Sequence, residues 1–235
     1  MTALRPGRCR FRIQQRGQML RVLETASESY VQRTRFNASQ TDATIAFAIN
    51  PNTPGERLTR REAGASRYLH VQLDLQRDPV EVARAIHAHI GERLRASSVN
   101  VAGHSVHTLA RYGIAQADLD AWIYAVFRSV AAAYPIGSIR TGGQTGVDMA
   151  GAVAGVALGI DVTVVMPRQF IQRGADGIDR PHTQGDIREH IEQQVQALSS
   201  LPWASDNTIR QDDAWKCSRN HASPRRSGLA DPDGP

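Results

Sequence analysis

The stretch that decides the fold is Ile139-Arg140-Thr141-Gly142-Gly143-Gln144-Thr145-Gly146-Val147-Asp148, where three glycines link a short apolar strand to an alanine-rich helix. Glycine tolerates positive φ and lets backbone amides approach an anion closely. The unpaired amides of a first helical turn, with the positive end of the helix dipole, form a phosphate site. The pattern therefore predicts a phosphate-binding loop, in which Thr141 and Thr145 add hydroxyl donors and Gln144 bonds a base or ribose.

Asp148, at the start of the helix, has several interpretations. Its carboxylate competes with a bound anion for the same amides, so it could instead bond ribose hydroxyls, hold a divalent cation or stabilise the helix start. The alternative for the whole loop is a tight strand-to-helix turn without a ligand. The loop lacks the spaced glycines of the dinucleotide pattern and the lysine of the triphosphatase phosphate-binding loop.

Strand and helix signals alternate about five times around this loop. Strands are expected at residues 42–49, 68–73, 99–103, 138–140 and 161–166, and helices at 57–65, 79–95, 119–130, 147–158 and 183–198. Such alternation requires crossover connections, which give a mostly parallel sheet with helices on both faces. We therefore predict an α/β, Rossmann-like fold of about five strands, with ligands bound beyond the carboxyl ends of the strands.

Three segments are expected along the chain. Residues 1–33 read as a basic arm followed by a short helix at 17–31, residues 34–199 as a nucleotide-binding domain, and residues 200–235 as a disordered polar tail. Arginines crowd the arm, and the net charge is +5. Nucleic-acid binding through this arm is therefore one functional alternative.

Composition narrows the class of protein. The 235 residues are 41% hydrophobic and 22% charged, as in globular proteins. No apolar run approaches the roughly 20 residues that span a bilayer, and the amino end has no apolar secretory segment. The two cysteines lie near opposite ends, which fits a reducing cytoplasm. The eight histidines show no ligand spacing, so no metal site is predicted. The oligomeric state stays open, a homo-oligomer included.

A second loop, residues 50–59, also follows a strand and opens a helix. In a parallel sheet both loops face the same edge, so one elongated ligand could bridge them. We expect Thr53, Gly55 and Thr59 to contact the ligand, and Glu56 and Glu62 to be the candidates for acid–base work or ribose binding. Solvated charges on an exposed helix are the alternative for each carboxylate.

Two further positions belong to the same predicted edge. Gly103 ends the strand at residues 99–103, so it is expected to face the ligand. Arg168 follows Pro167 in a glycine-containing loop, which could cover the site as a lid or form an ordinary solvated connection.

These residues resemble a known family. The glycine loop with its flanks, residues 139–150 and 158–160, resembles the opening of proteins labelled molybdenum carriers, which belong to the SLOG group of Rossmann-like domains. That group includes the lysine decarboxylase-like nucleotide glycosidases and the DNA-processing protein A fold. Thr34–Thr44 resembles the segment before the family's second ligand loop, Gly55–Ala63 resembles that loop and helix, and Asn100–Gly103 resembles the last strand. Because the glycine loop comes last here, the chain looks circularly permuted.

The resemblance implies a nucleotide or nucleotide-derived ligand, held by a sensor or carrier. It also implies the molybdenum cofactor as a candidate ligand. The glycosidase branch carries a glutamate in its second loop. Here ungapped matching places Arg61 where that glutamate is usual and Glu62 one position later. Hydrolysis of a nucleoside monophosphate at its glycosidic bond is therefore the alternative from the enzyme class, with Glu56 or Glu62 assisting.

Overall fold

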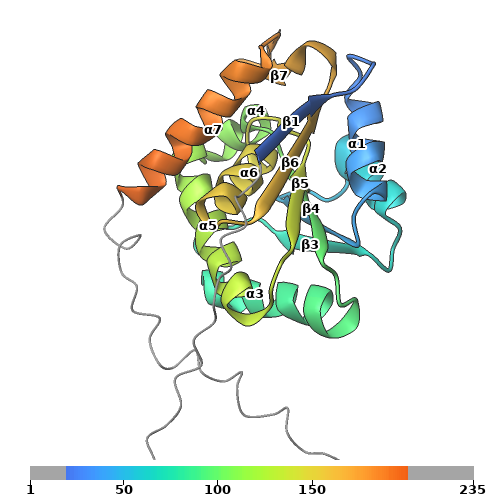
Figure 1. Cartoon of the computed structure of the whole chain (residues 1–235), viewed down its shortest axis with the longest axis vertical. Helices are drawn as coiled ribbons and strands as arrows, with labels where there is room; N and C mark the ends of the chain where they lie inside the picture. The colour runs from blue at the N-terminus through green and yellow to red at the C-terminus, as the bar shows by residue number, and fades with distance from the viewer. Residues whose placement is uncertain (1–19, 201–235) are drawn as a thin grey trace, which may run out of the picture. The chain divides into compact units, whose positions relative to one another are not determined.

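Six parallel strands lie side by side in the order β1-β6-β5-β4-β2-β3 in the computed structural model, which describes residues 20–200 (Figure 1). The strands are β1 (Leu20–Glu24), β2 (Ala43–Ala48), β3 (Tyr68–Gln72), β4 (Ser98–Gly103), β5 (Ser138–Thr141) and β6 (Asp161–Met166). This architecture confirms the predicted Rossmann-like α/β class. The sheet has one strand more than the five segments identified in the sequence.

Helices cover both faces of the sheet. The longer helices are α1 (Tyr30–Ser39), α2 (Pro54–Ala63), α3 (Pro79–His87), α5 (Gln116–Ala133), α6 (Val147–Ala157) and α7 (Gln184–Ser199). Helices α1 and α2 pack together on one face, whereas α5 contacts α3 and α6, and α6 contacts α7, on the other (Figure 1). Within residues 20–200 no helix is both long and apolar enough to cross a bilayer.

Short elements complete the fold. They are a π-helical turn at Ala88–Arg93, helix α4 (Val106–Leu109), 3₁₀ turns at Ala110–Tyr112 and Arg168–Phe170, and the antiparallel pair β7 (Gln172–Arg173) and β8 (Asp179–Arg180). Thr183 and Asp186 form a reciprocal cap of α7, at the start of the helix predicted at residues 183–198.

The core lies where α5 crosses the sheet. Every residue of β2 is buried, because helices cover both faces of a parallel sheet. Phe47 of β2 makes edge-on ring contacts with Trp122 and Phe127 of α5, at centroid distances of 5.9 and 6.2 Å. Helix α5 lies in the connection between β4 and β5.

The helix predicted at residues 17–31 is wrong over residues 20–29, and only its last two residues are helical. Leu20–Glu24 forms the edge strand β1 instead and pairs with β6, from Leu20 opposite Val162 to Glu24 opposite Met166. Pairing with the free edge of β6 outweighs a weak helical pattern that has little local support. The next helix begins only at Tyr30, after Ser29 accepts a bond from the Val31 amide. Residues 1–19 and 201–235, which hold most of the expected arm and the tail, lie outside the described residues.

Helix α6 approaches the sheet through two glycines on one face. A Cβ at Gly151 would lie 2.6 Å from Val101 Cγ1, and a Cβ at Gly155 would lie 2.5 Å from Val162 Cγ2. The alanine- and glycine-rich composition of this helix therefore serves close packing, which draws the amino end of α6 and its Asp148 against the strand ends.

We predict that Gly151→Ala destabilises the protein. Overpacking costs about 1–3 kcal/mol, which exceeds the gain of about 1 kcal/mol from replacing glycine by alanine in a helix. Gly185→Ala is the matched control, because its Cβ would meet only Thr183 Oγ1 at 3.5 Å and the change should be neutral or stabilising. Urea unfolding of the two variants checks the sign, and equal stabilisation by both would contradict the packing argument.

Candidate functional site

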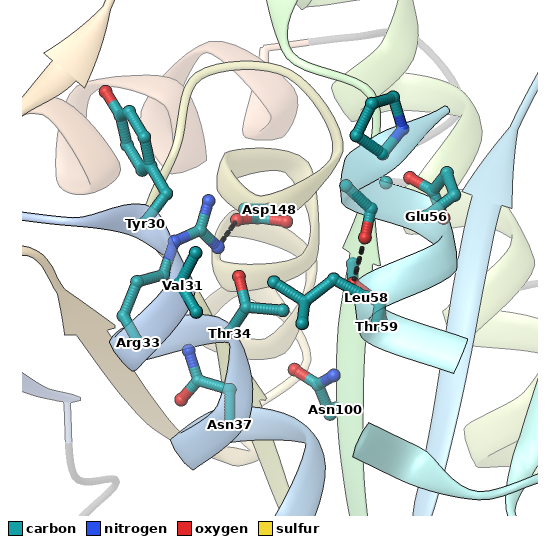
Figure 2. Close-up of a pocket in the computed structure, with 14 residues that line it drawn as sticks. Tyr30, Val31, Arg33, Thr34, Asn37, Glu56, Leu58, Thr59, Asn100 and Asp148 are labelled. Carbon is teal, nitrogen blue, oxygen red and sulfur yellow. Dashed lines mark hydrogen bonds and ion pairs between the residues drawn. The ribbon is translucent and has the colours of Figure 1, made fainter. Parts of the chain in front are cut away.

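A cavity of about 260 Å³ opens at the carboxyl-terminal end of β4, between α1 and α2 (Figure 2). Its walls come from α1, from the amino end of α2, from β4 and from Asp148 of α6. Figure 2 shows Arg33 and Asn37 on the α1 side, with Glu56 across from them on α2. The cavity thus brings together the second predicted loop and one residue that follows the glycine loop.

An ion pair between Arg33 and Asp148 forms one end of the cavity. Arg33 Nη1 donates to Asp148 Oδ2 at 2.6 Å, and the side chains are 13% and 3% exposed. Burial raises the pKa of the Asp148 carboxyl, while Arg33 and hydrogen bonds from the Gln144 and Gly103 amides counteract that rise. Because a Cβ at Gly142 would overlap the Arg33 guanidinium, this pair requires glycine at that position.

Glu56, on α2, is a buried carboxyl without a full set of partners. The residue is 4% exposed, and its Oε2 atom has no hydrogen-bond partner. Burial, with a contribution from the nearby Asp148 charge, raises the pKa of Glu56 to about 7. The Glu56 carboxyl therefore gains and loses its proton close to neutral pH. The residue also lines a cavity that a ligand can reach.

His104 lies next to Glu56, and its hydrogen bonding defines its tautomer. The Asn50 amide donates to His104 Nε2 at 3.2 Å, so the ring carries its proton on Nδ1. That nitrogen lies 3.8 Å from Glu56 Oε1. Burial, followed by the charge of His70, lowers the pKa of His104. A neutral imidazole thus presents an N–H toward Glu56 Oε1.

Asn37 anchors α1 to the sheet and also faces the cavity. Its amide nitrogen donates to the carbonyls of Thr141 at 3.1 Å and Val165 at 3.2 Å, whereas its Oδ1 has no partner. Arg33 Nε is likewise buried without a partner. Three of the six unpaired buried side-chain atoms within residues 20–200 therefore belong to residues that line this one cavity: Arg33 Nε, Asn37 Oδ1 and Glu56 Oε2.

The amides of the glycine loop are occupied by the protein itself. They donate as follows: Gly143 to Thr141 Oγ1 (3.1 Å), Gln144 to the Asp148 carboxylate, Thr145 to Gln144 Oε1 (3.0 Å), Gly146 to Gln116 Oε1 (2.6 Å), and Val147 to the His104 carbonyl (3.0 Å). The sequence argument required unpaired amides, and that requirement is not met. A tight strand-to-helix turn, the alternative, describes the loop in this structure.

Close packing explains the glycines of the loop. A Cβ at Gly143 would lie 2.5 Å from Val164 Cγ1, and one at Gly146 would lie 2.3 Å from the His104 carbonyl oxygen. Both residues also have positive φ. Thr145 points its hydroxyl at the Arg173 carbonyl, 2.6 Å away, so this donor too is engaged within the protein.

The loop after β6 covers the glycine loop. Gln172 Nε2 donates to the Gly143 carbonyl at 2.6 Å, and the Arg173 amide donates to Gln144 Oε1 at 2.7 Å. Asp179 of the same loop accepts the Tyr30 hydroxyl at 2.9 Å. Arg168, the residue predicted to contact the ligand from this loop, instead pairs with Glu28 and does not line the cavity.

The predicted site residues divide into two groups. Those that line the cavity are Gly55, Glu56, Thr59, Gly103 and Asp148. Outside it, Thr53 caps α2 by accepting the Glu56 amide at 3.3 Å, and Glu62 forms ion pairs with Arg61 and Arg35.

The sequence prediction missed the α1 wall, whose lining residues include Tyr30, Arg33, Thr34 and Asn37. Because residues 17–31 were assigned to one helix, the start of α1 at Tyr30 was not identified. The resemblance over Thr34–Thr44 was the available signal, because it includes Asn37.

The molybdenum cofactor, which the resemblance brought in, does not fit the residues of this cavity. The cofactor is a phosphorylated anion, and the one lining guanidinium is already paired with Asp148. In the part of the chain that the structure describes, no three His, Cys, Asp or Glu residues gather as a metal site. No step is therefore assigned to this group.

We predict that Glu56→Gln stabilises the protein more at pH 8 than at pH 4. The pKa of Glu56 rises from 4.5 to about 7 on folding, so the native state binds more protons in this range and stability falls as the pH rises. The loss is complete above about pH 7 and amounts to about 3 kcal/mol. Urea unfolding at both pH values measures it. Glu62→Gln, on the same helix, should show no such gain, and a pH-independent effect of Glu56→Gln would refute the burial argument.

Comparison with known families adds to this geometry. Residues 12–116 match the model of the circularly permutated YpsA SLOG family. The matched range contains α1, α2 and β4, which form most of the cavity wall, and it ends before the glycine loop. Comparisons with curated proteins and with solved structures gave no match. This match, over somewhat less than half of the chain, supports an assignment to the SLOG superfamily of Rossmann-like domains, with its segments in circularly permuted order.

Proposed function

We propose that this protein binds a nucleotide or nucleotide-derived small molecule in the cavity between α1 and α2, as a sensor or carrier. The match to the SLOG family model points to a nucleotide-related ligand. The observation that carries the proposal is that three unpaired buried atoms belong to residues that line the cavity, namely Arg33, Asn37 and Glu56. A buried polar atom without a partner costs about 1–3 kcal/mol, so a ligand that pairs these atoms recovers that cost.

The position of the cavity supports this proposal. Ligands of parallel α/β sheets bind beyond the carboxyl ends of the strands, and Gly103 at the end of β4 lines the cavity. Polar groups stand beside apolar ones, including Val31, Pro54 and Leu58. Such a mixture of apolar walls and a few convergent polar groups is typical of small-molecule sites.

We predict that Gly55→Leu abolishes ligand binding without unfolding the protein. Gly55 lines the cavity, and a Cβ there meets no atom within 4 Å, so the new side chain enters the space a ligand needs. Affinity should fall at least about tenfold, the equivalent of 1.4 kcal/mol. Calorimetric and thermal-shift titration with mononucleotides, cyclic nucleotides and ADP-ribose derivatives measures the loss.

The control is Ala65→Leu, which adds similar bulk at an exposed position just beyond α2. It should bind like the unaltered protein. Undiminished binding by Gly55→Leu would place the ligand elsewhere, and silence of the unaltered protein across the whole panel would refute the proposed function.

The second candidate is hydrolysis of a nucleoside monophosphate at its glycosidic bond. The observation that favours it is the contrast between two carboxyl groups of one cavity: Glu56 titrates near pH 7, whereas Asp148 is paired with Arg33. Carboxyl groups in such different surroundings can divide acid and stabilising roles between them. In this reaction the C1′–N bond would break as Glu56 protonates the leaving base, and water would bond to C1′ and give up a proton that restores Glu56, so that the products are the free base and ribose 5-phosphate.

We expect Glu56→Gln to reduce base release from a hydrolysed monophosphate by about 10²- to 10⁴-fold, the usual contribution of a general acid. Activity of the unaltered protein should decline above about pH 7, because an acid must hold its proton. Glu62→Gln, whose carboxylate lies outside the cavity, should retain full activity. Chromatographic detection of free base measures all three, and zero turnover on every common monophosphate would exclude the hydrolase.

A further inference from the structure

We propose that the cavity recognises the ribose ring of a nucleoside through its neighbouring hydroxyls and provides no phosphate site. This inference rests on the proposed function and names the part of the ligand that the cavity holds. Its basis is the match between the unpaired atoms of the wall and the hydrogen-bonding capacity of the two candidate groups, a diol and a phosphate.

The unpaired atoms call for a partner that both donates and accepts. Glu56 Oε2 and Asn37 Oδ1 are oxygens, and Arg33 Nε carries a hydrogen. Each hydroxyl donates one hydrogen and accepts others, so two adjacent hydroxyls supply the donors that the two oxygens lack and an acceptor for the Arg33 N–H, once side-chain rotation turns these buried atoms toward the cavity. Phosphate oxygens act as acceptors, so a phosphate would bond Arg33 and leave the Asn37 oxygen unpaired.

The charges of the cavity also oppose a phosphate. The guanidinium of Arg33 is held by Asp148 at 2.6 Å, so its charge is already compensated. Glu56 adds a second carboxyl to the wall, and it lies in the first turn of α2, where it already faces the positive end of that helix dipole. A phosphate would be buried beside these carboxyl groups, where like charges repel strongly because little water screens them.

The glycine loop supplies no compensation. The amides from Gly143 to Val147 each bond a group of the protein, including Gln116 Oε1 at 2.6 Å and Thr141 Oγ1 at 3.1 Å. An anion would have to break these bonds before it could form its own. At about 260 Å³ the cavity is smaller than the roughly 300–1,000 Å³ of typical ligand pockets, which suits one ring of a ligand and leaves a 5′ substituent outside.

The test is a set of calorimetric titrations of the full chain with the four ribonucleosides, their 2′-deoxy counterparts, their 5′-monophosphates and inorganic phosphate. We expect a ribonucleoside to bind about as tightly as its monophosphate. Loss of the 2′-hydroxyl should weaken binding by about 10-fold or more, as expected when a buried partner is left unpaired. Excess inorganic phosphate should not compete.

Matched variants locate the effect. Glu56→Gln removes the charge while keeping one oxygen acceptor, so it should weaken the ribonucleoside and shift the preference toward the monophosphate. Glu62→Gln, on the same helix but outside the cavity, should leave both affinities unchanged. The deoxy series uses the unaltered protein, so it decides the question even if a variant fails to fold.

Any of three results would overturn the inference. If a 2′-deoxynucleoside binds as tightly as its ribonucleoside, the cavity does not recognise the neighbouring hydroxyls. If a monophosphate binds at least about tenfold more tightly than its nucleoside, or inorganic phosphate competes, the cavity holds a phosphate and the proposed function survives without the ribose assignment. If no nucleoside and no nucleotide binds, both the assignment and the proposed function fail.

Discussion

The contact on which the rest of the site depends is the buried ion pair between Arg33 and Asp148, closed over Gly142. It ties α1 to the amino end of α6 across the ends of the strands. A buried charge that loses its partner is strongly destabilising, so each residue holds the other in place. The pair also explains why glycine stands at position 142, since any side chain there would overlap the guanidinium. One electrostatic contact thus fixes both the helix that forms one cavity wall and the course of the loop.

The Asp148 carboxylate of this ion pair also takes part in bonding the loop amides, so they are not free to bind an anion as the glycine pattern predicts. Asp148 accepts the Gln144 amide, Gln116 accepts the Gly146 amide, and Gln116 is in turn bonded to Asp120 at 2.7 Å. These bonds satisfy backbone donors that would otherwise be buried without partners. Three of the six unpaired buried atoms within residues 20–200 belong instead to Arg33 and Asn37 of α1 and to Glu56 of α2. Open hydrogen-bonding capacity, rather than glycine content, therefore marks the candidate site.

Local signals predicted much of the fold correctly. The apolar run at residues 42–49 became the buried strand β2, and the 183–186 pattern became the cap of α7. Such features depend on near neighbours in the chain, and the sequence displays them directly. The strand Leu20–Glu24 could not be predicted in this way, because its conformation depends on the edge of β6, about 140 residues later in the chain.

The candidate site, like the fold, was predicted from the sequence only in part. The sequence by itself determined the alternation of strands and helices, and thereby the edge of the sheet where Gly55, Glu56, Gly103 and Asp148 meet. Only the tertiary structure decided that Arg33 and Asn37 complete the cavity and that the loop amides are already bonded. The physical reason is that hydrogen-bond satisfaction is settled between residues distant in the chain, such as Asp148 and Arg33, whose 115-residue separation no local pattern can bridge.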